Sequence, residues 1–306
     1  MKKSIKLFAL LTIFIMGNTS CAKAQKNYTN DNPAYIIYNS SGKKVSYGEM
    51  LKSVSGADIL LFGELHNDVM SHWLELQLTK DLHNLKKEKL VIGAEMWEAD
   101  NQLVLDEMMN SEYVDLNTYI ESSVLWHNFK NDYLPVLKYA KDNDLRFVAT
   151  NIPRRYARIV SKRGEPALDS LSAQAKSYIA PLPIHMDLKD EFYTYIADVF
   201  KETQQNVMTG SSLTNFVKAQ IVKDATMAHF IVKNLPEKGY FFHFNGELHS
   251  AFNSGIGYYI KHYNPKLKFK TISVIKKSNV FDFKSKESRA DFNILVPENM
   301  SISYGN

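Results

Sequence analysis

The sequence contains very little cysteine. Its one cysteine, Cys21, lies near the start of the 306 residues, so the chain after it can form neither a disulfide nor a thiolate metal site. A bound metal would need histidine, carboxylate or tyrosine ligands instead. The HExxH helix, the Gly-x-Ser-x-Gly elbow, the phosphate-binding loop and the dinucleotide-binding glycine pattern are absent as well. These absences argue against serine hydrolases, kinases and dehydrogenases.

No apolar run in the sequence reaches the roughly 20 residues that a membrane-spanning helix needs. The N-terminal stretch MKKSIKLFALLTIFIMGNTSC has a basic start, an apolar run from Leu7 to Met16 and small polar residues before Cys21. That order is typical of an export signal. Cys21 stands where bacterial lipoproteins are cleaved and acylated, so we predict a signal peptide over 1–20 and a lipid on Cys21. The alternative is an ordinary secretory signal that leaves a free thiol.

The charge of the chain indicates no nucleic-acid partner. The formal net charge of +4 includes three lysines of the predicted signal, and the rest of the chain therefore stands near +1. No basic stripe with interleaved aromatics is present, and export makes nucleic acid an improbable ligand. The lipid on Cys21 predicts a protein anchored in the cell envelope. Because Ala22 and Lys23 after the cysteine are not acidic, we expect the anchor in the outer membrane, with the protein facing the periplasm.

Short apolar runs alternate with longer amphipathic stretches, which predicts an α/β protein with a mostly parallel central sheet flanked by helices. The expected strands are residues 35–38, 58–62, 89–94, 146–150, 240–244, 270–275 and 293–296. Helices are expected over 68–85, with Trp73, Leu76, Leu82 and Leu85 on one face and Asp68 in the first turn, and over 132–143.

The chain between residues 155 and 232 shows helical patterns but no strand pattern. We therefore predict a polar tether over 21–34, a core domain built from 35–154 and 233–300, and a smaller helical insertion or cap over 155–232.

The tetrapeptide Gly-Glu-Leu-His occurs twice, as GELHND at residues 63–68 and as NGELHS at residues 245–250, each time after a strand-like run. Ligands of α/β sheets bind beyond the carboxyl ends of parallel strands. The predicted strands deliver Glu64, His66, Glu95 and His249 to that edge. They also deliver Asn151, Pro153, Arg154, Asn245 and Glu247.

These side chains suit a divalent metal, acid–base chemistry or the binding of a polar ligand. Each also has a structural interpretation, since a glutamate after a strand is often a helix cap and a single histidine is often a core residue. His72 faces either the same crevice or solvent. Gln220 and Asp224 share a helix face and either hold the crevice or decorate the helix.

The order of several motifs resembles the ChaN-like haem-binding lipoproteins. The motifs are GELHND with His72 and Gln77, GAEMWEADNQLVLDEMM, Trp126, DYLPVLKYAKDNDLRFVATNIPRRYARIVSKRG, AQIVKDATMAHFIV and FNGELHSAFNSGIGYYI, which span roughly residues 55–262. This family is grouped with TraB, the Tiki metalloproteases and the erythromycin esterases, which share Gly-x-x-His and scattered acidic residues.

The resemblance implies a lipid-anchored protein that binds haem for iron uptake, with a tyrosine as iron ligand and pairs of haems held between two protomers of a homodimer. Tyr156, beside Arg154, is the first candidate ligand, followed by Tyr193 and Tyr195, with a histidine such as His72 next. The alternative is that Glu64, His66, Glu95 and His249 bind a divalent metal and activate water, as in a periplasmic metal-dependent hydrolase of a peptide or ester bond.

Overall fold

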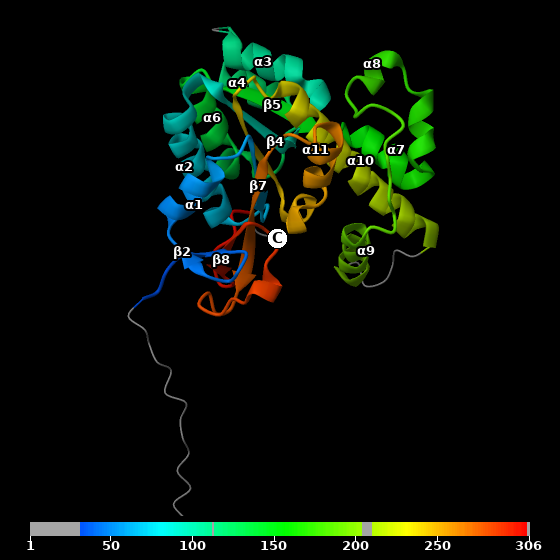
Figure 1. Cartoon of the computed structure of the whole chain (residues 1–306). Helices are drawn as coiled ribbons and strands as arrows, with labels where there is room; N and C mark the ends of the chain where they lie inside the picture. Colours follow the sequence, from blue (N-terminus) through cyan, green and yellow to red (C-terminus); the bar gives the residue numbers. More distant parts are fainter. Residues whose placement is uncertain (1–30, 112, 204–209, 305–306) are drawn as a thin grey trace, which may run out of the picture. The chain divides into compact units, whose positions relative to one another are not determined.

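An eight-stranded sheet lies at the centre of the computed structural model (Figure 1), which describes residues 31–111, 113–203 and 210–304. Its strand order is β2-β1-β8-β7-β3-β6-β4-β5. The strands from β8 to β5 pair in parallel, and β1 joins the edge antiparallel to both β8 and β2. The prediction of an α/β fold with a mostly parallel sheet is thus confirmed. The strands are β1 (Ile36–Asn39), β2 (Lys44–Val45), β3 (Ile59–Glu64), β4 (Leu90–Glu98), β5 (Arg146–Asn151), β6 (Tyr240–Gly246), β7 (Phe269–Lys277) and β8 (Phe292–Pro297).

The central strands are buried on both faces, which explains their nearly continuous apolar sequences. Every residue of β3, ILLFGE, and of β6, YFFHFNG, is buried. Figure 1 shows the reason, since helices cover both faces of the sheet. Apart from Tyr240 and His243 of β6, the polar residues of these two strands lie at their carboxyl ends, where the site is.

One face of the sheet is covered by α1 to α6, whose apolar residues form a core with Leu60, Phe62 and Ile92 of the strands. The helices are α1 (Tyr47–Val54), α2 (Val69–Lys86), α3 (Gln102–Asn110), α4 (Leu116–Ser122), α5 (Phe129–Asp132) and α6 (Leu134–Asp142), with short 3-10 turns η1 (Lys87–Lys89) and η2 (Ala99–Asn101).

The buried face of α2 agrees only in part with the expected one. Leu82 is fully buried and Leu76 packs against the core as expected, whereas Trp73 and Leu85 are about half exposed (50% and 56%). The inward face instead contains Leu74 and Leu78 together with buried polar residues, which a choice based on apolar residues alone does not find. Asp68 caps the helix, because its side chain accepts a hydrogen bond from the Ser71 N–H at 2.9 Å.

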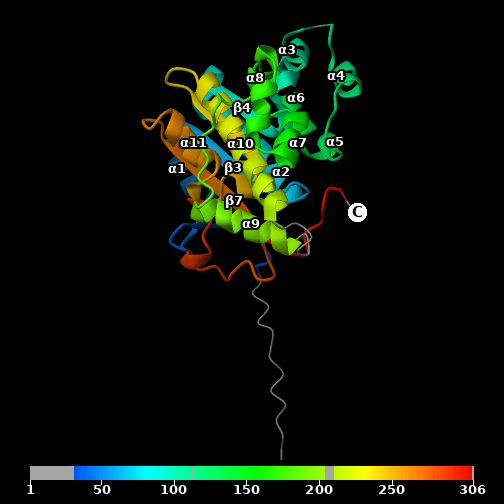
Figure 2. The same cartoon turned by 90° about the vertical axis from the view of Figure 1, so that its right-hand side faces the viewer.

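The other face of the sheet is covered by the helices between β5 and β6 together with α11 (Figure 1). These helices are α7 (Arg154–Arg163), α8 (Ala173–Lys176), α9 (Glu191–Thr203), α10 (Gly210–Asn234) and α11 (Ile256–Tyr263), with 3-10 turns η3 (Glu165–Ser170), η4 (Glu247–His249), η5 (Ala251–Asn253) and, later in the chain, η6 (Ser285–Glu287). The long helix α10 packs against α7, α9 and α11. Figure 2 shows α9 beside the N-terminal end of α10.

Residues 34–306 form one compact unit. None of the helices among the described residues has the length and apolar character to cross a membrane. The predicted signal peptide and Cys21 lie outside the described residues.

Candidate functional site

A cavity of about 980 Å³ opens at the carboxyl ends of β3 and β6. Its walls come from the Gly-Glu-Leu-His segments, from the loop before α5, and from α9 and α10. The apolar lining residues are Leu65, Met96, Val124, Leu125, Trp126, Ile196, Val199, Phe200 and Leu248. The polar lining residues include Glu64, His66, Asp224, His249, Gln220, Arg154, Arg289, Tyr195 and Tyr304. Both Gly-Glu-Leu-His copies therefore meet at one cavity, because β3 and β6 are parallel neighbours.

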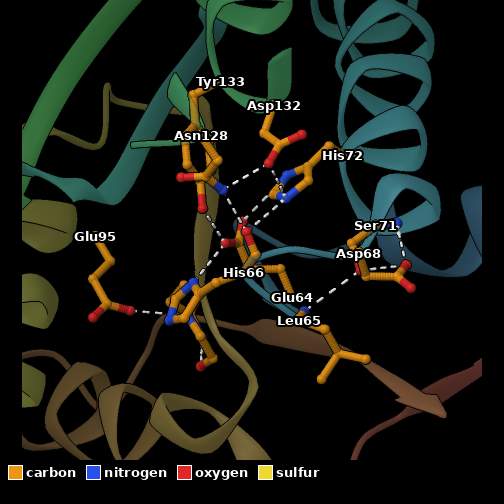
Figure 3. Close-up of polar contacts among 12 residues, drawn as sticks. Glu64, Leu65, His66, Asp68, Ser71, His72, Glu95, Asn128, Asp132 and Tyr133 are labelled. Carbon is orange, nitrogen blue, oxygen red and sulfur yellow. Dashed lines mark hydrogen bonds and ion pairs between the residues drawn. The ribbon is translucent and has the colours of Figure 1, made fainter. Parts of the chain in front are cut away.

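Glu64 and His66 form the first polar pair of the site (Figure 3). The Nδ1 of His66 donates to Oε1 of the fully buried Glu64 at 2.7 Å, and the Tyr133 hydroxyl donates to the same oxygen at 2.6 Å. Burial alone would raise the pKa of Glu64, but the hydrogen bonds from His66 and from Glu75 outweigh it and lower that pKa to about 2. Burial also opposes the charge on His66, yet Glu64 raises the pKa of that imidazole.

Gly246 leaves room for the imidazole ring of His66. A Cβ at Gly246 would lie 2.8 Å from Nε2 of His66, a distance that side-chain contacts do not allow. The side chain of His66 is 41% exposed and packs edge-on against Trp126, with ring centroids 4.9 Å apart. The second Gly-Glu-Leu-His copy thus supplies the space that the imidazole of the first copy occupies.

Behind Glu64 lies a second polar layer formed by α2, by Asp132 of α5 and by Asn128, which also lines the cavity (Figure 3). The Nδ1 of His72 is 3.0 Å from Oε2 of Glu75, and its Nε2 is 3.1 Å from the carbonyl oxygen of His66. The Asn128 amide donates to that same carbonyl at 2.5 Å and to Asp132 at 2.6 Å. Burial and the nearby Glu64 raise the pKa of Glu75 well above its usual value.

His249 lies between two buried carboxylates. Its Nδ1 is 2.5 Å from Oδ1 of Asp224, and its Nε2 is 3.3 Å from Oε1 of Glu95. Burial lowers the pKa of this histidine, but Glu95 and then Asp224 more than compensate and raise it to about 10. Because both ring nitrogens face carboxylates, this environment favours the imidazolium form of His249.

The two carboxylates respond differently to this ion. Burial opposes the charge of Glu95, but His249 outweighs it and lowers the pKa of Glu95 well below its usual value. Glu95 also accepts a hydrogen bond from the Gly246 N–H at 2.8 Å. For Asp224 burial dominates and raises the pKa, even though Asp224 accepts hydrogen bonds from His249 and from the Tyr193 hydroxyl, the latter at 3.0 Å.

The structure brings together most of the residues expected at the carboxyl edge. Glu64, His66 and His249 line the cavity, and Glu95 contacts it through His249 and Gly246. Gln220 and Asp224, one helical turn apart on α10, also line it. The remaining polar residues of the strand ends have structural partners: Glu247 accepts from Ser273 at 2.9 Å and from Arg289 at 3.2 Å, the amide of Asn245 donates to Ser250, and that of Asn151 donates to the carbonyl of Glu95.

Only some of the candidate iron ligands line the cavity. Tyr195 and Arg154 line the cavity. Tyr156 does not line the cavity. Its ring lies on the side of α7 that packs into the apolar core with α10, and its hydroxyl oxygen accepts a hydrogen bond from Arg155 at 3.3 Å. Tyr193 is buried with its hydroxyl bonded to Asp224, and burial together with the Asp224 charge raises its pKa well above the usual value. His72 faces neither the cavity nor solvent, because its ring lies in the layer behind Glu64.

The four residues expected to bind a metal lie in two contacting pairs, Glu64 with His66 and Glu95 with His249. Among the described residues, a group of three or more side chains with potential ligand atoms within 4.8 Å of one another is formed instead by Glu64, His72 and Glu75. Of these, the sequence had indicated Glu64 as a metal ligand and His72 as a haem residue, but not Glu75.

Sequence reasoning missed Glu75, Tyr133, Asn128 and Asp132. Glu75 follows His72 by three residues on α2, which places both on one helix face. That spacing was a usable signal. Tyr133, Asn128 and Asp132 come from a loop and short helices more than 60 residues after Glu64, so only the tertiary fold reveals their position.

Comparisons with known proteins agree with this architecture. The sequence model of a family described as haem-binding uptake, Tiki superfamily, ChaN matches residues 50–260. A solved structure described as cofacial haem binding to ChaN of Campylobacter jejuni superposes with a TM-score of 0.68 at 17% identity, covering 87% of this chain and 98% of that chain.

Two other solved structures are less similar. A protein from Bacillus cereus has a TM-score of 0.44 at 14% identity, covering 76% of this chain and 70% of that one. An erythromycin esterase variant in its open conformation has a TM-score of 0.44 at 13% identity, covering 80% and 77%. No curated protein matches the sequence. Since the family match spans more than half of the sequence, the chain belongs to the ChaN family of the Tiki superfamily.

Proposed function

We propose that this protein binds haem in the cavity at the carboxyl ends of β3 and β6 and takes part in haem or iron uptake. The observation that carries the proposal is the cavity itself. Its volume of about 980 Å³ is at the upper end of small-molecule pockets, which span roughly 300–1,000 Å³. It combines an extended apolar wall with two arginines and a tyrosine, a set of groups that suits a haem.

The apolar wall matches the porphyrin ring. Trp126, Leu125, Ile196, Val199 and Phe200 approach the cavity from two separate elements, the loop before α5 and helix α9. Two apolar surfaces with a space between them suit a flat apolar ligand, whose burial contributes about 25 cal/mol per Å² of apolar area.

Two guanidinium groups at the cavity suit the two propionates of haem. The Arg154 side chain is 74% exposed, and its Nε is 3.8 Å from Glu98. Arg289 is 35% exposed and shares a hydrogen bond with Glu247. Arginine pairs with carboxylates through two parallel hydrogen bonds, which favours this role over a simple charge attraction.

Tyr195 is the tyrosine best placed to coordinate the iron. It lines the cavity, its ring packs edge-on against Phe252 with centroids 5.3 Å apart, and its hydroxyl has no hydrogen-bond partner among the described residues. A tyrosine oxygen is an established type of haem-iron ligand. The bound haem would supply the iron, while Tyr195 holds it and the protonated His249 keeps a positive charge beside the cavity.

Titration of haemin into the purified full chain tests this proposal. We expect a Soret band that saturates at a defined stoichiometry. Tyr195→Phe should lose the ferric-phenolate absorption and bind haemin at least tenfold more weakly. Tyr156→Phe is the matched control, because it removes the same oxygen outside the cavity and should leave both unchanged. Absence of saturation, or an effect of Tyr156→Phe in place of Tyr195→Phe, would contradict the proposal.

The metal-dependent hydrolase alternative has less support. It requires Glu64, His66, Glu95 and His249 to share a metal, whereas His249 directs both nitrogens at carboxylates. We therefore give preference to haem binding.

We further propose that the protein is exported and anchored through lipid on Cys21, in the outer membrane facing the periplasm. The support is the N-terminal sequence pattern. A single acyl chain gives only marginal membrane binding, so a stable anchor needs the several chains of a lipoprotein. Cys21→Ser should yield an uncleaved or soluble form; unchanged membrane fractionation would refute the anchor.

A homodimer is proposed for the haem-loaded protein. Val124 lines the cavity and is 92% exposed, so an apolar part of the rim is left for a partner to cover. The relative from Campylobacter jejuni is described with cofacial haems, an arrangement that two facing copies would produce. Sedimentation with and without haemin should show a haem-dependent dimer; a monomer at saturating haemin would contradict it.

A further inference from the structure

Directly behind the haem cavity lies a group of three side chains that the proposed haem function does not use. Glu64 ends β3, and His72 and Glu75 lie in the first two turns of α2. Each offers one ligand atom, and these atoms lie within 4.8 Å of one another. All three residues are buried, with exposures of 1%, 6% and 0%.

The orientation of the His72 ring is fixed by the contacts of its Nε2 atom. Nε2 is 3.1 Å from the carbonyl oxygen of His66 and 3.5 Å from Oδ2 of Asp132, and both of these atoms only accept hydrogen bonds. In the neutral imidazole the proton therefore lies on Nε2, and Nδ1 directs a lone pair at the two glutamates. A ligating histidine is typically oriented in this way, by a carbonyl or carboxylate on its other nitrogen.

Two carboxylate oxygens in this group face only each other's carboxyl group. Oε2 of Glu64 and Oε1 of Glu75 are buried and accept no hydrogen bond from a backbone, hydroxyl, amide or basic group among the described residues. Oε2 of Glu64 is 3.9 Å from Nδ1 of His72, so it points into the group. Buried polar atoms are nearly always satisfied, since desolvation without a partner costs about 1–3 kcal/mol, and more for a charged group. Three electron-pair donors thus converge on one point, which only a cation or a proton can satisfy.

The spacing of these atoms fits a small divalent cation. Zn²⁺ binds nitrogen and oxygen at about 2.0–2.2 Å, which in a tetrahedral site separates neighbouring ligand atoms by about 3.3 Å. The observed separations of 3.0 Å from His72 to Glu75 and 3.9 Å from His72 to Glu64 lie on either side of this value. One imidazole and two carboxylates form a borderline ligand set that suits first-row divalent metals.

We propose that Glu64, His72 and Glu75 bind one first-row divalent cation, with Zn²⁺ as the best match. The cation ties the end of β3 to the start of α2. The cation also fixes the carboxylate of Glu64, which in turn positions His66 at the cavity wall through their hydrogen bond. The alternative occupant of the same space is a proton carried by Glu75 and directed at Glu64.

Metal analysis separates the two occupants. The full chain is stripped with EDTA, equilibrated with a limiting amount of Zn²⁺ alone and then desalted. We expect about one retained Zn²⁺ per chain and a higher thermal unfolding midpoint than in EDTA. Glu75→Gln should weaken Zn²⁺ binding at least tenfold. Asp81→Asn, a change of a carboxylate on the same helix α2 but outside the group, should retain the metal, with circular dichroism verifying the fold of both variants.

Co²⁺ provides a second measurement that does not depend on the folding of a variant. Co²⁺ added to the EDTA-treated wild-type chain should develop ligand-field bands that Zn²⁺ abolishes at one equivalent. Zn²⁺ that is lost on desalting, binding that survives Glu75→Gln, or binding abolished by Asp81→Asn would each overturn the proposal. Haemin affinity is scored separately, so a failure of this site leaves the haem proposal untouched and the reverse also holds.

Discussion

Replacement of His249 by glutamine should destabilise the protein strongly. The imidazolium lies between Glu95 and Asp224, and glutamine would leave two buried carboxylates without a compensating charge. Removal of one member of a buried charge pair costs roughly 3–5 kcal/mol. The rise of the His249 pKa from 6.5 to about 10 gives a similar estimate, about 5 kcal/mol in favour of the protonated form.

The pH dependence follows from the sign of this shift. Because the pKa of His249 is higher in the folded state, its contribution is fully present below about pH 6.5 and is lost as the pH rises through about 10. Urea unfolding followed by circular dichroism should therefore show a large difference between wild type and His249→Gln at neutral pH. The difference should shrink above about pH 10.

Two further variants sharpen this test. Adding Glu95→Gln to His249→Gln removes one unpaired carboxylate and should recover part of the lost stability. Lys138→Ala disrupts an exposed pair with Asp142 and should cost no more than about 1 kcal/mol. The reasoning is refuted if His249→Gln costs as little as Lys138→Ala, or if its cost is the same on both sides of pH 10.

Three smaller predictions concern the framework of the site, each measured by urea unfolding. Leu78→Ala on the buried face of α2 should cost about 2–5 kcal/mol and Leu85→Ala no more than about 0.5 kcal/mol; equal losses would show that the helix presents another face. Tyr133→Phe removes a donor to the buried Glu64 and should cost about 1.5–3 kcal/mol, whereas a neutral effect would mean that this hydrogen bond is not formed. Asp68→Ala removes the N-cap of α2 and should cost about 0.5–2 kcal/mol, which an unchanged urea midpoint would disprove.

The sheet was largely predictable because its strands are buried on both sides. Burial on both faces requires continuous apolar sequence, and each predicted strand overlaps an observed one among the described residues. The two-residue strand β2 was missed, since Lys44–Val45 is too short to show a pattern. Because parallel strands end at one edge, the sequence alone places Glu64, His66 and His249 at a common crevice.

The direction of individual side chains could not be predicted in the same way. Tyr156 follows two arginines at the end of β5, but the phase of α7 turns its ring into the core. The burial of Glu75 could not be predicted, because a buried polar residue on a helix looks the same in the sequence as a solvent-exposed one. Only the partners of that residue, His72 and Glu64, distinguish the two cases, and the approach of β3 to α2 that supplies Glu64 is a tertiary contact.

The central claim is that haem binds in the cavity at the carboxyl ends of β3 and β6. X-ray diffraction at the iron absorption edge, from crystals of the protein with haemin, tests it most directly. The account predicts one strong anomalous peak per chain inside the cavity, within coordination distance of the Tyr195 hydroxyl. An iron peak elsewhere, for example at the exposed stacked rings of His185 and His262, or no peak at saturating haemin, would contradict it.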